Sequence, residues 1–429
     1  MRRKRDERPL PGCHRTRSAR RARGRDAHHR SHPEQKIRVT DKTIFIIAGE
    51  ESGDTHAARL IRELKAAVPG LRIEGLGGDR MKQVGCELRA DIVSSAVMGF
   101  AQVVKNLRYF RRMLAETAAY LEQSPPDALV LVDYPGFNLR LAAAVRKLGI
   151  PIVYYISPQI WAWRPGRIHT IARLVDKMIV IFPFEEELYR KEKVDVTYVG
   201  HPILDNLSEV ELDADFLNRL AAMDSTDHIG LLPGSRRQEI MAILPIMLET
   251  ARLILRQMPH ARFLIPCSSQ PNRDVVEQML GDSSLRVEVS LGKMYEVAKS
   301  ARCCIVASGT ATLEVASLLT PLVVVYRIGH LTWLLGKRFL KVPHISLVNI
   351  LAGQEVVPEM LQYRMRPELL AETVVELCRD GERRQKMVSD LRKVRERIGA
   401  PGASSRAAKV VSELLDSKCS APLAARSSC

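Results

Sequence analysis

The sequence has few of the features that mark membrane, secreted and metal-binding proteins. No apolar run approaches the ~18–20 residues of a membrane-spanning helix, and no apolar stretch follows the basic N-terminus as it does in a secretory signal. None of the eight cysteines among the 429 residues forms a CxxC pair, which disfavours a zinc site and a disulfide framework. We therefore expect free thiols in a reducing cytosol.

Two nucleotide-binding signatures are also missing. Neither the Walker sequence GxxxxGK[ST] nor the GxGxxG fingerprint of the dinucleotide-binding fold occurs. An Asp-x-Asp sequence does occur at Asp213–Asp215, but it lies in a polar stretch rather than at the end of a strand. We interpret it as a chance occurrence rather than as the metal-binding element of a sugar transferase.

The positive charge is concentrated at the N-terminus. The formal net charge is +16, and residues 1–40 hold 14 Lys or Arg against 4 Asp or Glu, which leaves a net of +6 for the rest. With almost no large apolar side chains, this tail cannot bury enough surface to order itself. Three interpretations stay open: a misassigned upstream start, an arm that is solvated or seeks an anionic surface, and a targeting peptide, which the low serine content disfavours.

The remaining chain alternates short apolar strands with helical stretches. Continuous apolar strands separated by helices are typical of a parallel sheet covered on both faces. An acidic, polar stretch at 200–224 separates two such series. We therefore predict an α/β fold of two doubly wound, Rossmann-like halves, with ligands bound beyond the carboxyl ends of the strands in a cleft between the halves.

The expected elements of both halves can be given by residue range. The strands are Thr43–Ala48, Arg72–Gly75, Ala128–Val132, Ile152–Ile156, Lys177–Ile181 and Val196–Val199, then Ile229–Leu232, Arg262–Ile265, Arg286–Val289, Cys303–Ala307 and Leu322–Tyr326. The main helices are Asp54–Ala67, Val103–Glu122, Leu139–Leu148, Gln238–Gln257, Arg273–Leu280 and Thr310–Leu318, and the chain after about Pro358 reads as helical.

Asp133 is the first candidate for chemistry, because it follows an apolar strand and so lies at the ligand edge of the predicted sheet. Pro135 and Gly136 predict a turn that delays the next helix. A carboxylate here can act as a general base on a hydroxyl. It can equally cap the following helix.

Two strand-to-helix turns in the second half favour an anion. Gly234 and Ser235, in the sequence Leu232–Arg237, free main-chain N–H groups at a helix start, and Arg236 offers a fork of donors suited to phosphate. The small residues of Ala307–Glu314 allow the same approach at the next helix. Alone, the first can be an ordinary strand–helix turn with surface arginines and the second a plain helix cap. Together they indicate a nucleotide diphosphate.

Two further segments have alternative interpretations. In Val97–Leu114, apolar residues recur at helical spacing opposite basic ones, as in a helix that lies on an anionic membrane or one that packs on its own sheet. Trp161 and Trp163 follow another strand and are equally suited to stacking on a sugar and to the core.

Taken together, these segments resemble the lipid-A-disaccharide synthase family, inverting glycosyltransferases of the GT-B architecture. The resemblance runs from about Thr43 to about Leu415, with Glu51 where the family usually has Ala. The matching segments are GEESGD (Gly49–Asp54), AVMGF (Ala96–Phe100), VDYPGFN (Val132–Asn138), SPQIWAWR (Ser157–Arg164), VGHP (Val199–Pro202), LLPGSR (Leu231–Arg236), ASGTATLE (Ala307–Glu314) and SLVNILAG (Ser346–Gly353).

The resemblance implies a reaction. UDP-2,3-diacylglucosamine would donate its sugar to the 6-hydroxyl of 2,3-diacylglucosamine 1-phosphate (lipid X), giving the β-1,6-linked disaccharide 1-phosphate and UDP. Asp133 matches the family's essential Asp and Arg236 its essential Arg. No cofactor or metal is implied. The enzyme would contact the cytoplasmic face of the inner membrane of a Gram-negative-type bacterium; no nucleic acid is expected, and a homodimer is left open.

The resemblance also distributes the candidate residues among three surfaces. The UDP-sugar-binding residues are Gly234, Ser235, Arg236, Ser308, Gly309, Thr310, Ala311, Glu314 and Asn349. The acceptor and cleft residues are Gly49, Glu50, Ser52, Gly53, Asp54, Trp161, Trp163 and His201. The membrane-contact residues are Val97, Met98, Phe100, Val103, Val104, Leu107 and Phe110.

Six segments follow from this organisation. They are a disordered basic tail at 1–40, an acceptor- and membrane-facing domain at 41–205, a linker at 206–225, a UDP-sugar-binding domain at 226–357, C-terminal helices at 358–416 that pack back toward the N-terminal domain, and a frayed tail at 417–429.

Two other functions remain as alternatives. An isomerase that resembles UDP-N-acetylglucosamine 2-epimerase would share the two-domain scaffold, but it needs no acyl-chain site, so the apolar and basic segment Val97–Leu114 counts against it. A nucleic-acid-binding protein led by the basic tail would bind in a strongly salt-dependent way. The rest of the chain shows no stripe of aromatics among basic residues, which disfavours it.

Overall fold

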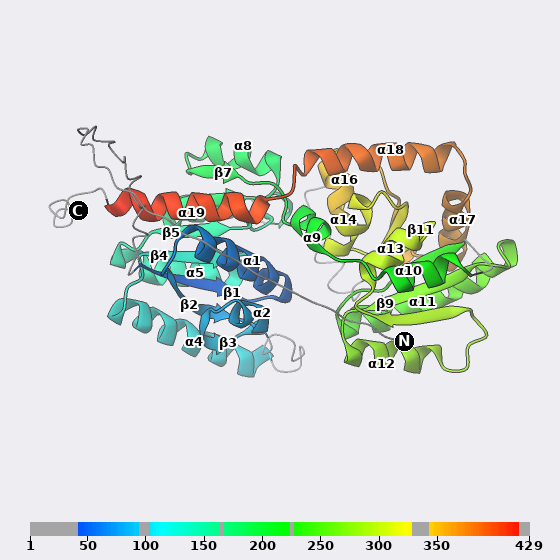
Figure 1. Cartoon of the computed structure of the whole chain (residues 1–429), viewed down its shortest axis with the longest axis horizontal. Coiled ribbons are helices and arrows are strands. Elements are labelled where there is room, and N and C mark those ends of the chain that lie inside the picture. The colour runs from blue at the N-terminus through cyan, green and yellow to red at the C-terminus, as the bar shows by residue number, and fades with distance from the viewer. Residues whose placement is uncertain (1–41, 94–102, 164–165, 224–226, 328–342, 420–429) are drawn as a thin grey trace, which may run out of the picture. The chain divides into compact units, whose positions relative to one another are not determined.

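The computed structural model describes residues 42–93, 103–163, 166–223, 227–327 and 343–419. The described chain forms two parallel sheets (Figure 1), one of seven strands in the order β3-β2-β1-β4-β5-β6-β7 and one of six in the order β10-β9-β8-β11-β12-β13. This confirms the predicted α/β class with two parallel-sheet halves.

The first sheet is built from the first half of the chain. Its strands are β1 (Thr43–Ala48), β2 (Arg72–Gly77), β3 (Glu87–Asp91), β4 (Ala128–Val132), β5 (Ile152–Tyr155), β6 (Lys177–Val180) and β7 (Val196–Tyr198). The accompanying helices are α1 (Glu51–Ala67), α2 (Asp79–Gln83), α4 (Val103–Gln123), α5 (Pro135–Val145), α6 (Ile160–Trp163), α7 (Arg167–Leu174), α8 (Pro183–Lys191) and α9 (Ile203–Glu209).

The second sheet follows after the short helix α10 (Ala214–Ala221). Its strands are β8 (His228–Leu232), β9 (Arg262–Cys267), β10 (Val287–Leu291), β11 (Cys303–Ala307), β12 (Leu322–Tyr326) and β13 (Glu359–Leu361). The later helices are α11 (Arg237–Gln257), α12 (Gln270–Leu280), α13 (Met294–Ser300), α14 (Thr310–Ser317), α16 (Leu347–Ala352), α17 (Pro367–Cys378), α18 (Glu382–Arg397) and α19 (Ala403–Cys419).

Apolar side chains on both faces of the strands build the core. Every residue of β4 and β11 is buried, as expected for strands covered by helices on both sides. In the first sheet, Tyr154 of β5 belongs to the layer that contains apolar residues of α4, α5 and α7. Its neighbour Tyr155 belongs to the opposite layer, with α1 and α9, because successive strand residues point to opposite faces.

Four local predictions differ from the structure. Helix α1 begins at Glu51 rather than Asp54, and α5 begins at Pro135, because proline is favourable at the first helical position instead of delaying the helix. Strand β3 was not predicted, since it is a charged edge strand with three of its five residues exposed. Strand β13 was read as helix; it has only three residues, too few for a periodic pattern.

Each sheet has one point where the order of the strands reverses. In the first sheet it lies between β1 and β4, whose last residues Ala48 and Val132 are register partners. In the second it lies between β8 and β11, where Leu232 is paired with Val306. Open α/β sheets bind ligands outside the carboxyl ends of strands at such a switch point. The loops after β1 and β4, which carry Gly49–Asp54 and Asp133, therefore meet at the first switch point. The loops after β8 and β11, which carry Gly234–Arg236 and Ser308–Ala311, meet at the second.

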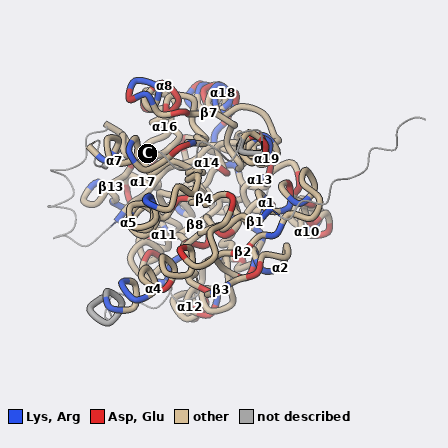
Figure 2. Tube along the Cα trace, turned by 90° about the vertical axis from the view of Figure 1, so that its left-hand side faces the viewer, with Lys and Arg blue, Asp and Glu red and all other residues tan. Residues whose placement is uncertain are grey.

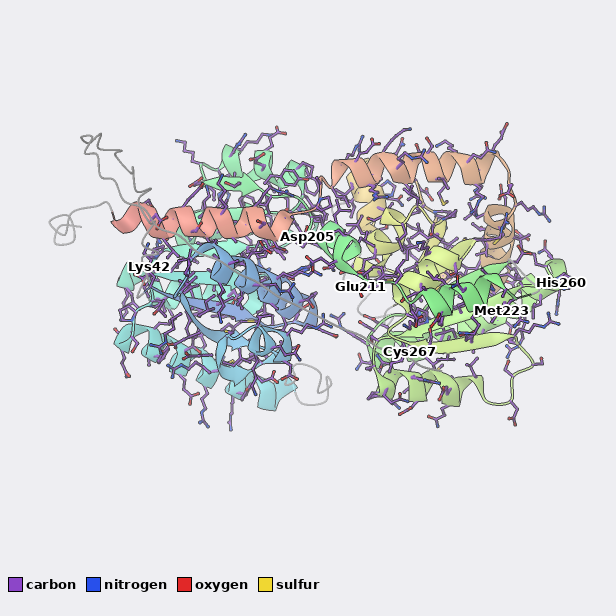
Figure 3. The ribbon with its side chains drawn as sticks, in the orientation of Figure 1. Lys42, Asp205, Glu211, Met223, His260 and Cys267 are labelled. Atoms are coloured by element: carbon purple, nitrogen blue, oxygen red, sulfur yellow. The ribbon has the colours of Figure 1, made fainter. Side chains whose placement is uncertain are left out.

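Helix α19 returns the end of the described chain to the first sheet. It packs along α1, and Lys42, just before β1, donates to the carboxylate of Asp416 at 2.9 Å (Figure 3). Helices α17 and α18 instead contact elements of the second sheet, including α11 and α14. Only α19 of these three therefore makes extensive contacts with first-sheet elements in the described chain.

Candidate active site

Asp133 lies at the switch point of the first sheet, directly after β4. Its φ of 44° and the φ of 48° at Tyr134 place two consecutive non-glycine residues in the left-handed region. Each such residue costs roughly 1–2 kcal/mol relative to a right-handed conformation. Strain of this kind persists only where surrounding contacts hold it, and it is concentrated at functional sites.

The surroundings of Asp133 make its carboxyl a stronger base than an ordinary aspartate. Burial raises the pKa of Asp133 to about 7, and the negative charge of Glu50 adds to the increase. Glu50 is exposed and comes directly before α1, on the neighbouring strand connection. The Glu50 charge thus disfavours ionisation of Asp133, as a nearby acid does at many catalytic sites.

Gly49 and Tyr134 fit each other closely beside this carboxylate. A Cβ atom on Gly49 would collide with the ring of Tyr134, so the glycine is required for the ring to lie where it does. Tyr134 also stacks on Phe137 with ring centroids 6.0 Å apart and contacts Phe110 of α4 at 6.4 Å. Phe110 therefore lies against the loop that carries Asp133 and Tyr134.

The other predicted residues of the loop after β1 are either exposed or buried. Ser52 is exposed in the first turn of α1, whereas Gly53 and Asp54 are buried. The Asp54 carboxylate accepts the main-chain N–H groups of Gly78, Arg80 and Met81 at 2.9–3.1 Å. These bonds satisfy donors at the start of α2, so Asp54 fixes the neighbouring connection.

Arg236 and its loop form the first half of the second switch point. Gly234 has φ 113°, and a Cβ there would meet the side chain of Glu239. The Arg236 guanidinium is 73% exposed at the start of the 21-residue helix α11, with one ion pair to Glu239 at 3.2 Å. It is therefore accessible to an anion that binds at this helix start.

The segment Ser308–Ala311 forms the other half of that switch point. Gly309 and Thr310 are exposed, and α14 begins at Thr310. No side chain caps this helix start: the Thr312 hydroxyl donates to the Gly309 carbonyl at 2.7 Å, and no side-chain bond to the first N–H groups occurs in the described residues. An exposed helix start whose N–H groups lack a side-chain cap is suited to bind an anion.

Glu314 and Asn349 differ in how many of their side-chain polar atoms already have a hydrogen-bond partner. Glu314, one turn into α14, accepts a 2.5 Å hydrogen bond from the Tyr295 hydroxyl of α13, and burial raises the pKa of its carboxyl. The Asn349 amide is fully engaged: its nitrogen donates to Val357 O and to Glu359 Oε1, and its oxygen accepts from the N–H groups of Val356 and Val357.

Trp161 and His201 are held by specific partners. The Trp161 indole donates to Glu185 at 3.2 Å and meets Phe184 edge-on at 5.3 Å. Burial raises the pKa of Glu185 to about 8. His201 is buried, its Nδ1 accepts from the N–H of Ile203, and burial lowers its pKa to about 3. The Trp163 side chain lies outside the described set.

Most of the predicted membrane contacts cannot be placed. Val97, Met98 and Phe100 lie outside the described residues, and of Val103, Val104 and Leu107 only the helical main chain of α4 is described. Arg108, Tyr109 and Arg111 are exposed on α4, whose basic first turns are blue in Figure 2. The described part of α4 therefore presents basic side chains to solvent and Phe110 toward Tyr134.

Several site residues were missed by the sequence motifs. Tyr154 and Asn138 bond to the Asp133 main chain, Tyr295 bonds to Glu314, and Glu185 bonds to Trp161. Of these, only Asn138 belongs to a quoted motif, VDYPGFN, where it offered a signal that was not used. The other three are separated from their partners by 19 to 24 residues, so no local pattern links them.

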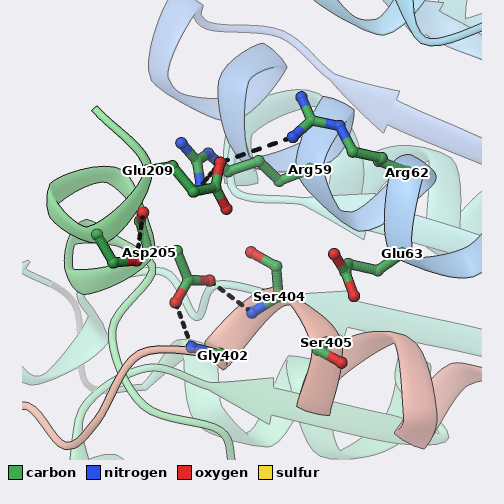
Figure 4. Close-up of a pocket in the computed structure, with 9 residues that line it drawn as sticks. Arg59, Arg62, Glu63, Asp205, Glu209, Gly402, Ser404 and Ser405 are labelled. Carbon is green, nitrogen blue, oxygen red and sulfur yellow. Dashed lines mark hydrogen bonds and ion pairs between the residues drawn. The ribbon is translucent and has the colours of Figure 1, made fainter. Parts of the chain in front are cut away.

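A polar pocket lies away from both switch points, between α1, α9 and the start of α19 (Figure 4). Asp205 there accepts the N–H groups of Gly402, Ala403 and Ser404 at 2.6–3.1 Å. Glu209 forms an ion pair with Arg59 at 3.0 Å. The Asp205 hydrogen bonds in this pocket connect the chain that precedes the second sheet with the chain that follows it. No cluster of three or more His, Cys, Asp or Glu suited to a metal ion occurs in the described ranges.

Comparison with known proteins gives consistent matches. Residues 44–413 match the family model described as lipid-A-disaccharide synthetase. The lipid-A-disaccharide synthase of Syntrophus aciditrophicus is 39% identical over 378 residues, covering 88% of this chain and 99% of the relative. That of Trichlorobacter lovleyi is 41% identical over 376 residues, covering 87% and 98%.

Solved structures share the fold at much lower identity. The UDP-GlcNAc 2-epimerase from Neisseria meningitidis bound to UDP-GlcNAc is 14% identical, with a TM-score of 0.56 over 88% of this chain and 100% of that one. The calicheamicin glycosyltransferase CalG4 is 15% identical, with a TM-score of 0.57 over 89% and 99%. In addition, none of the described helices is both long and apolar enough to cross a bilayer.

Proposed function

Because the chain belongs to the lipid-A-disaccharide synthase family, and so is a GT-B glycosyltransferase that uses a UDP-sugar, we propose that Asp133 and Arg236 carry its catalysis. The observation that supports this most strongly is the strained, partly buried Asp133 at a switch point, with its pKa raised to about 7. The epimerase alternative is not favoured, since the epimerase structures match at 14% identity and share the fold alone.

The reaction we propose is transfer of 2,3-diacylglucosamine from UDP to the 6-hydroxyl of 2,3-diacylglucosamine 1-phosphate. The Asp133 carboxylate takes the hydroxyl proton while that oxygen forms a bond to the anomeric carbon. The bond from this carbon to the diphosphate oxygen breaks, and UDP leaves with the electron pair. Attack opposite the leaving group inverts the anomeric centre. Because a carboxyl of pKa about 7 is still far less basic than an alkoxide, proton transfer is late and concerted with attack.

The second switch point is the proposed site of the diphosphate. The exposed Arg236 fork and the free N–H groups at Gly309–Ala311 stabilise the negative charge that develops on the leaving oxygen. Gly234, Ser235 and Ser308 complete this loop pair. We assign the free carboxylate oxygen of Glu314 to the ribose hydroxyls, with Tyr295 orienting it. Asn349 has no free group and supports Glu359 instead.

The first switch point is the proposed acceptor side. Gly49, Glu50 and Ser52 follow β1, whose last residue pairs with the end of β4 just before Asp133, and Trp161 offers a partly exposed ring for a sugar face. Gly53 is buried beside Ala48. Asp54 and His201 are also buried, and the Asp54 carboxylate and His201 Nδ1 accept main-chain N–H groups, so we propose that these three residues shape the site without touching the substrate.

Both substrates carry acyl chains, which supports a peripheral contact with the membrane through α4. A helix with basic and apolar faces binds an anionic surface through both. The exposed Arg108 and Arg111 suit the lipid headgroups of the cytoplasmic leaflet of the inner membrane. We propose this location for the enzyme in a Gram-negative-type bacterium.

The deciding experiment is a UDP-release assay with purified enzyme in detergent, supplied with UDP-2,3-diacylglucosamine, lipid X and EDTA. We expect release only with both lipids, together with a disaccharide by mass spectrometry. Release without lipid X would indicate hydrolysis. A folded enzyme that releases no UDP from this pair, but converts UDP-N-acetylglucosamine to its 2-epimer, would overturn the proposed reaction.

A further inference from the structure

Both polar groups of the Asp133 main chain, the N–H and the carbonyl, form hydrogen bonds. Its N–H donates to the Tyr155 carbonyl at 3.1 Å, which continues the ladder between β4 and β5. Its carbonyl accepts two side-chain bonds, from the Tyr154 hydroxyl at 2.6 Å and from the Asn138 amide nitrogen at 2.7 Å. The bonds to the carbonyl come from β5 and α5, so two separate elements converge on one atom.

The conformation held in this way is uncommon at two consecutive residues that are not glycine. Both Asp133 and Tyr134 have positive φ, and neither is a glycine. A strained conformation of this kind relaxes unless its surroundings fix it. The direction of the Asp133 side chain depends on this main-chain conformation, because the Cα–Cβ bond turns with φ.

We propose that Tyr154 and Asn138 are positioning residues for glycosyl transfer, whose hydrogen bonds to the Asp133 carbonyl hold the left-handed turn and aim the carboxylate at the acceptor hydroxyl. This rests on the proposal that Asp133 is the catalytic base. Neither side chain touches the substrate in this scheme. Both act through the main chain of Asp133.

The two side chains are suited to this task. Tyr154 and Asn138 are both fully buried, so water does not compete for the carbonyl. Burial, with the nearby Asp133 charge, raises the pKa of the Tyr154 hydroxyl well above its ordinary value, so it stays a donor throughout the working pH range. The Asn138 nitrogen also reaches the carbonyl of Val132 at 3.3 Å, which ties the strand end to the turn.

The test compares Tyr154→Phe with Tyr155→Phe. Both variants remove one hydroxyl from a fully buried tyrosine of the same strand, but the Tyr155 side chain belongs to the opposite layer, where its hydroxyl lies near Ser404 of α19 rather than near Asp133. Its main-chain carbonyl is unchanged by the substitution. We expect kcat to fall about tenfold or more in Tyr154→Phe, because a displacement of ~1 Å can cost up to 10²-fold, with KM for the UDP-sugar unchanged. Equal kcat values in the two variants would overturn the proposal.

A double-variant comparison separates positioning from a general loss of structure. If Tyr154 acts only through the Asp133 carboxylate, adding Tyr154→Phe to Asp133→Asn causes no further loss, because groups that act as a unit are non-additive. If the kcat losses of Asp133→Asn and Tyr154→Phe multiply in the double variant, the proposal is contradicted. This holds even if Tyr154→Phe also lowers stability. The near-isosteric variant Asn138→Leu, which has no donor, should reproduce the kcat loss of Tyr154→Phe; wild-type kcat in this variant would exclude Asn138.

The pH profile gives a second readout. The charged or titratable groups near the Asp133 carboxyl are Glu50, Tyr134 and Tyr154. If the turn relaxes in Tyr154→Phe, the carboxyl gains water, and the acid limb of kcat/KM moves to lower pH relative to Tyr155→Phe. An unmoved limb would argue against displacement of the base. If Asp133→Asn itself kept normal turnover, the base assignment would fail, and this outcome is distinct from failure of Tyr154→Phe alone.

Discussion

At the scale of single residues, we expect the ionisation of Asp133, the proposed base, to set the pH dependence of turnover. The base works only when it is deprotonated, and burial raises its pKa to about 7. We therefore expect kcat/KM to rise with pH through about 7 and then level off. The profile should be measured with UDP release at saturating detergent and constant ionic strength. A limb near pH 4, the range of an ordinary aspartate, would contradict the raised pKa.

We also expect the ionisation of Asp133 to lower the stability of the folded protein. The folded pKa of about 7 lies above the ordinary value of 3.8, so folding favours the protonated form, and stability is lost as pH rises from 3.8 through 7. Asp133→Asn cannot ionise. We expect this variant to lose turnover by at least 10²-fold and to melt at a higher temperature than wild type above pH 7. The difference should narrow toward pH 4, and calorimetry at both pH values checks this.

Arg236 offers a test of the diphosphate site. Its guanidinium is exposed and has one ion pair, so removing it leaves no buried charge behind. We expect Arg236→Ala to lower kcat/KM by roughly 10²–10³-fold, the loss typical of a missing oxyanion donor. Arg236→Lys keeps the charge without the planar fork and should recover only part of this. Neighbouring Arg237→Ala serves as the control, and equal losses in both alanine variants would remove the special role of Arg236.

At the scale of elements, α4 is the segment whose surface role can be tested directly. Substituting Phe110 would disturb Tyr134 as well as any membrane contact, so the exposed Arg108 and Arg111 are the cleaner targets. At about 1 kcal/mol per basic residue near an anionic surface, reversing both charges should weaken binding to anionic vesicles at least tenfold. Cosedimentation measures this. The matched control reverses the exposed Arg392 and Arg395 of α18. Equal weakening in both pairs would contradict a role specific to α4.

The elements that the sequence predicted well are those whose physical signal is local. Strands such as β4, β11 and β12 are continuous apolar runs, and all three have the predicted bounds. Strand β3 has alternating burial and charged residues, and β13 has three residues, so neither stands out from a loop. The start of α5 was misplaced because Pro135 reads as a breaker, although the first turn of a helix accepts it.

The candidate site divides in the same way. The loops at Asp133, Arg236 and Gly309 could be predicted because each follows a strand and opens a helix. The supports of those loops could not, because Tyr154, Tyr295 and Glu185 are brought to their partners by strand register and helix packing. Glu314 was predicted as a carboxylate, but its burial against Tyr295, which raises its pKa, depends on tertiary packing.

At the scale of the whole described chain, the segments that enter and leave the second sheet are bonded to each other. The His201 N–H donates to the Ile398 carbonyl at 3.1 Å, and Arg406 donates to the Val199 carbonyl at 2.8 Å. Gly399 and Gly402 both have φ of 93°, which allows the chain to turn sharply between α18 and α19. Asp205 completes the junction at the first turn of α19.

The junction predicts that Asp205 of α9, which accepts N–H groups at the start of α19, matters for stability far more than an exposed carboxylate on α19. Asp205→Ala would leave three N–H groups at a buried helix start without a partner, which costs about 2 kcal/mol or more. Asp416→Ala removes a surface ion pair and should cost less than about 1 kcal/mol. Urea unfolding should show this order, and limited proteolysis of Asp205→Ala should cut first near Gly399–Gly402. Equal midpoints for the two variants would mean that α19 is held to the first sheet by its apolar contacts with α1 alone, and that Asp205 adds nothing to that docking.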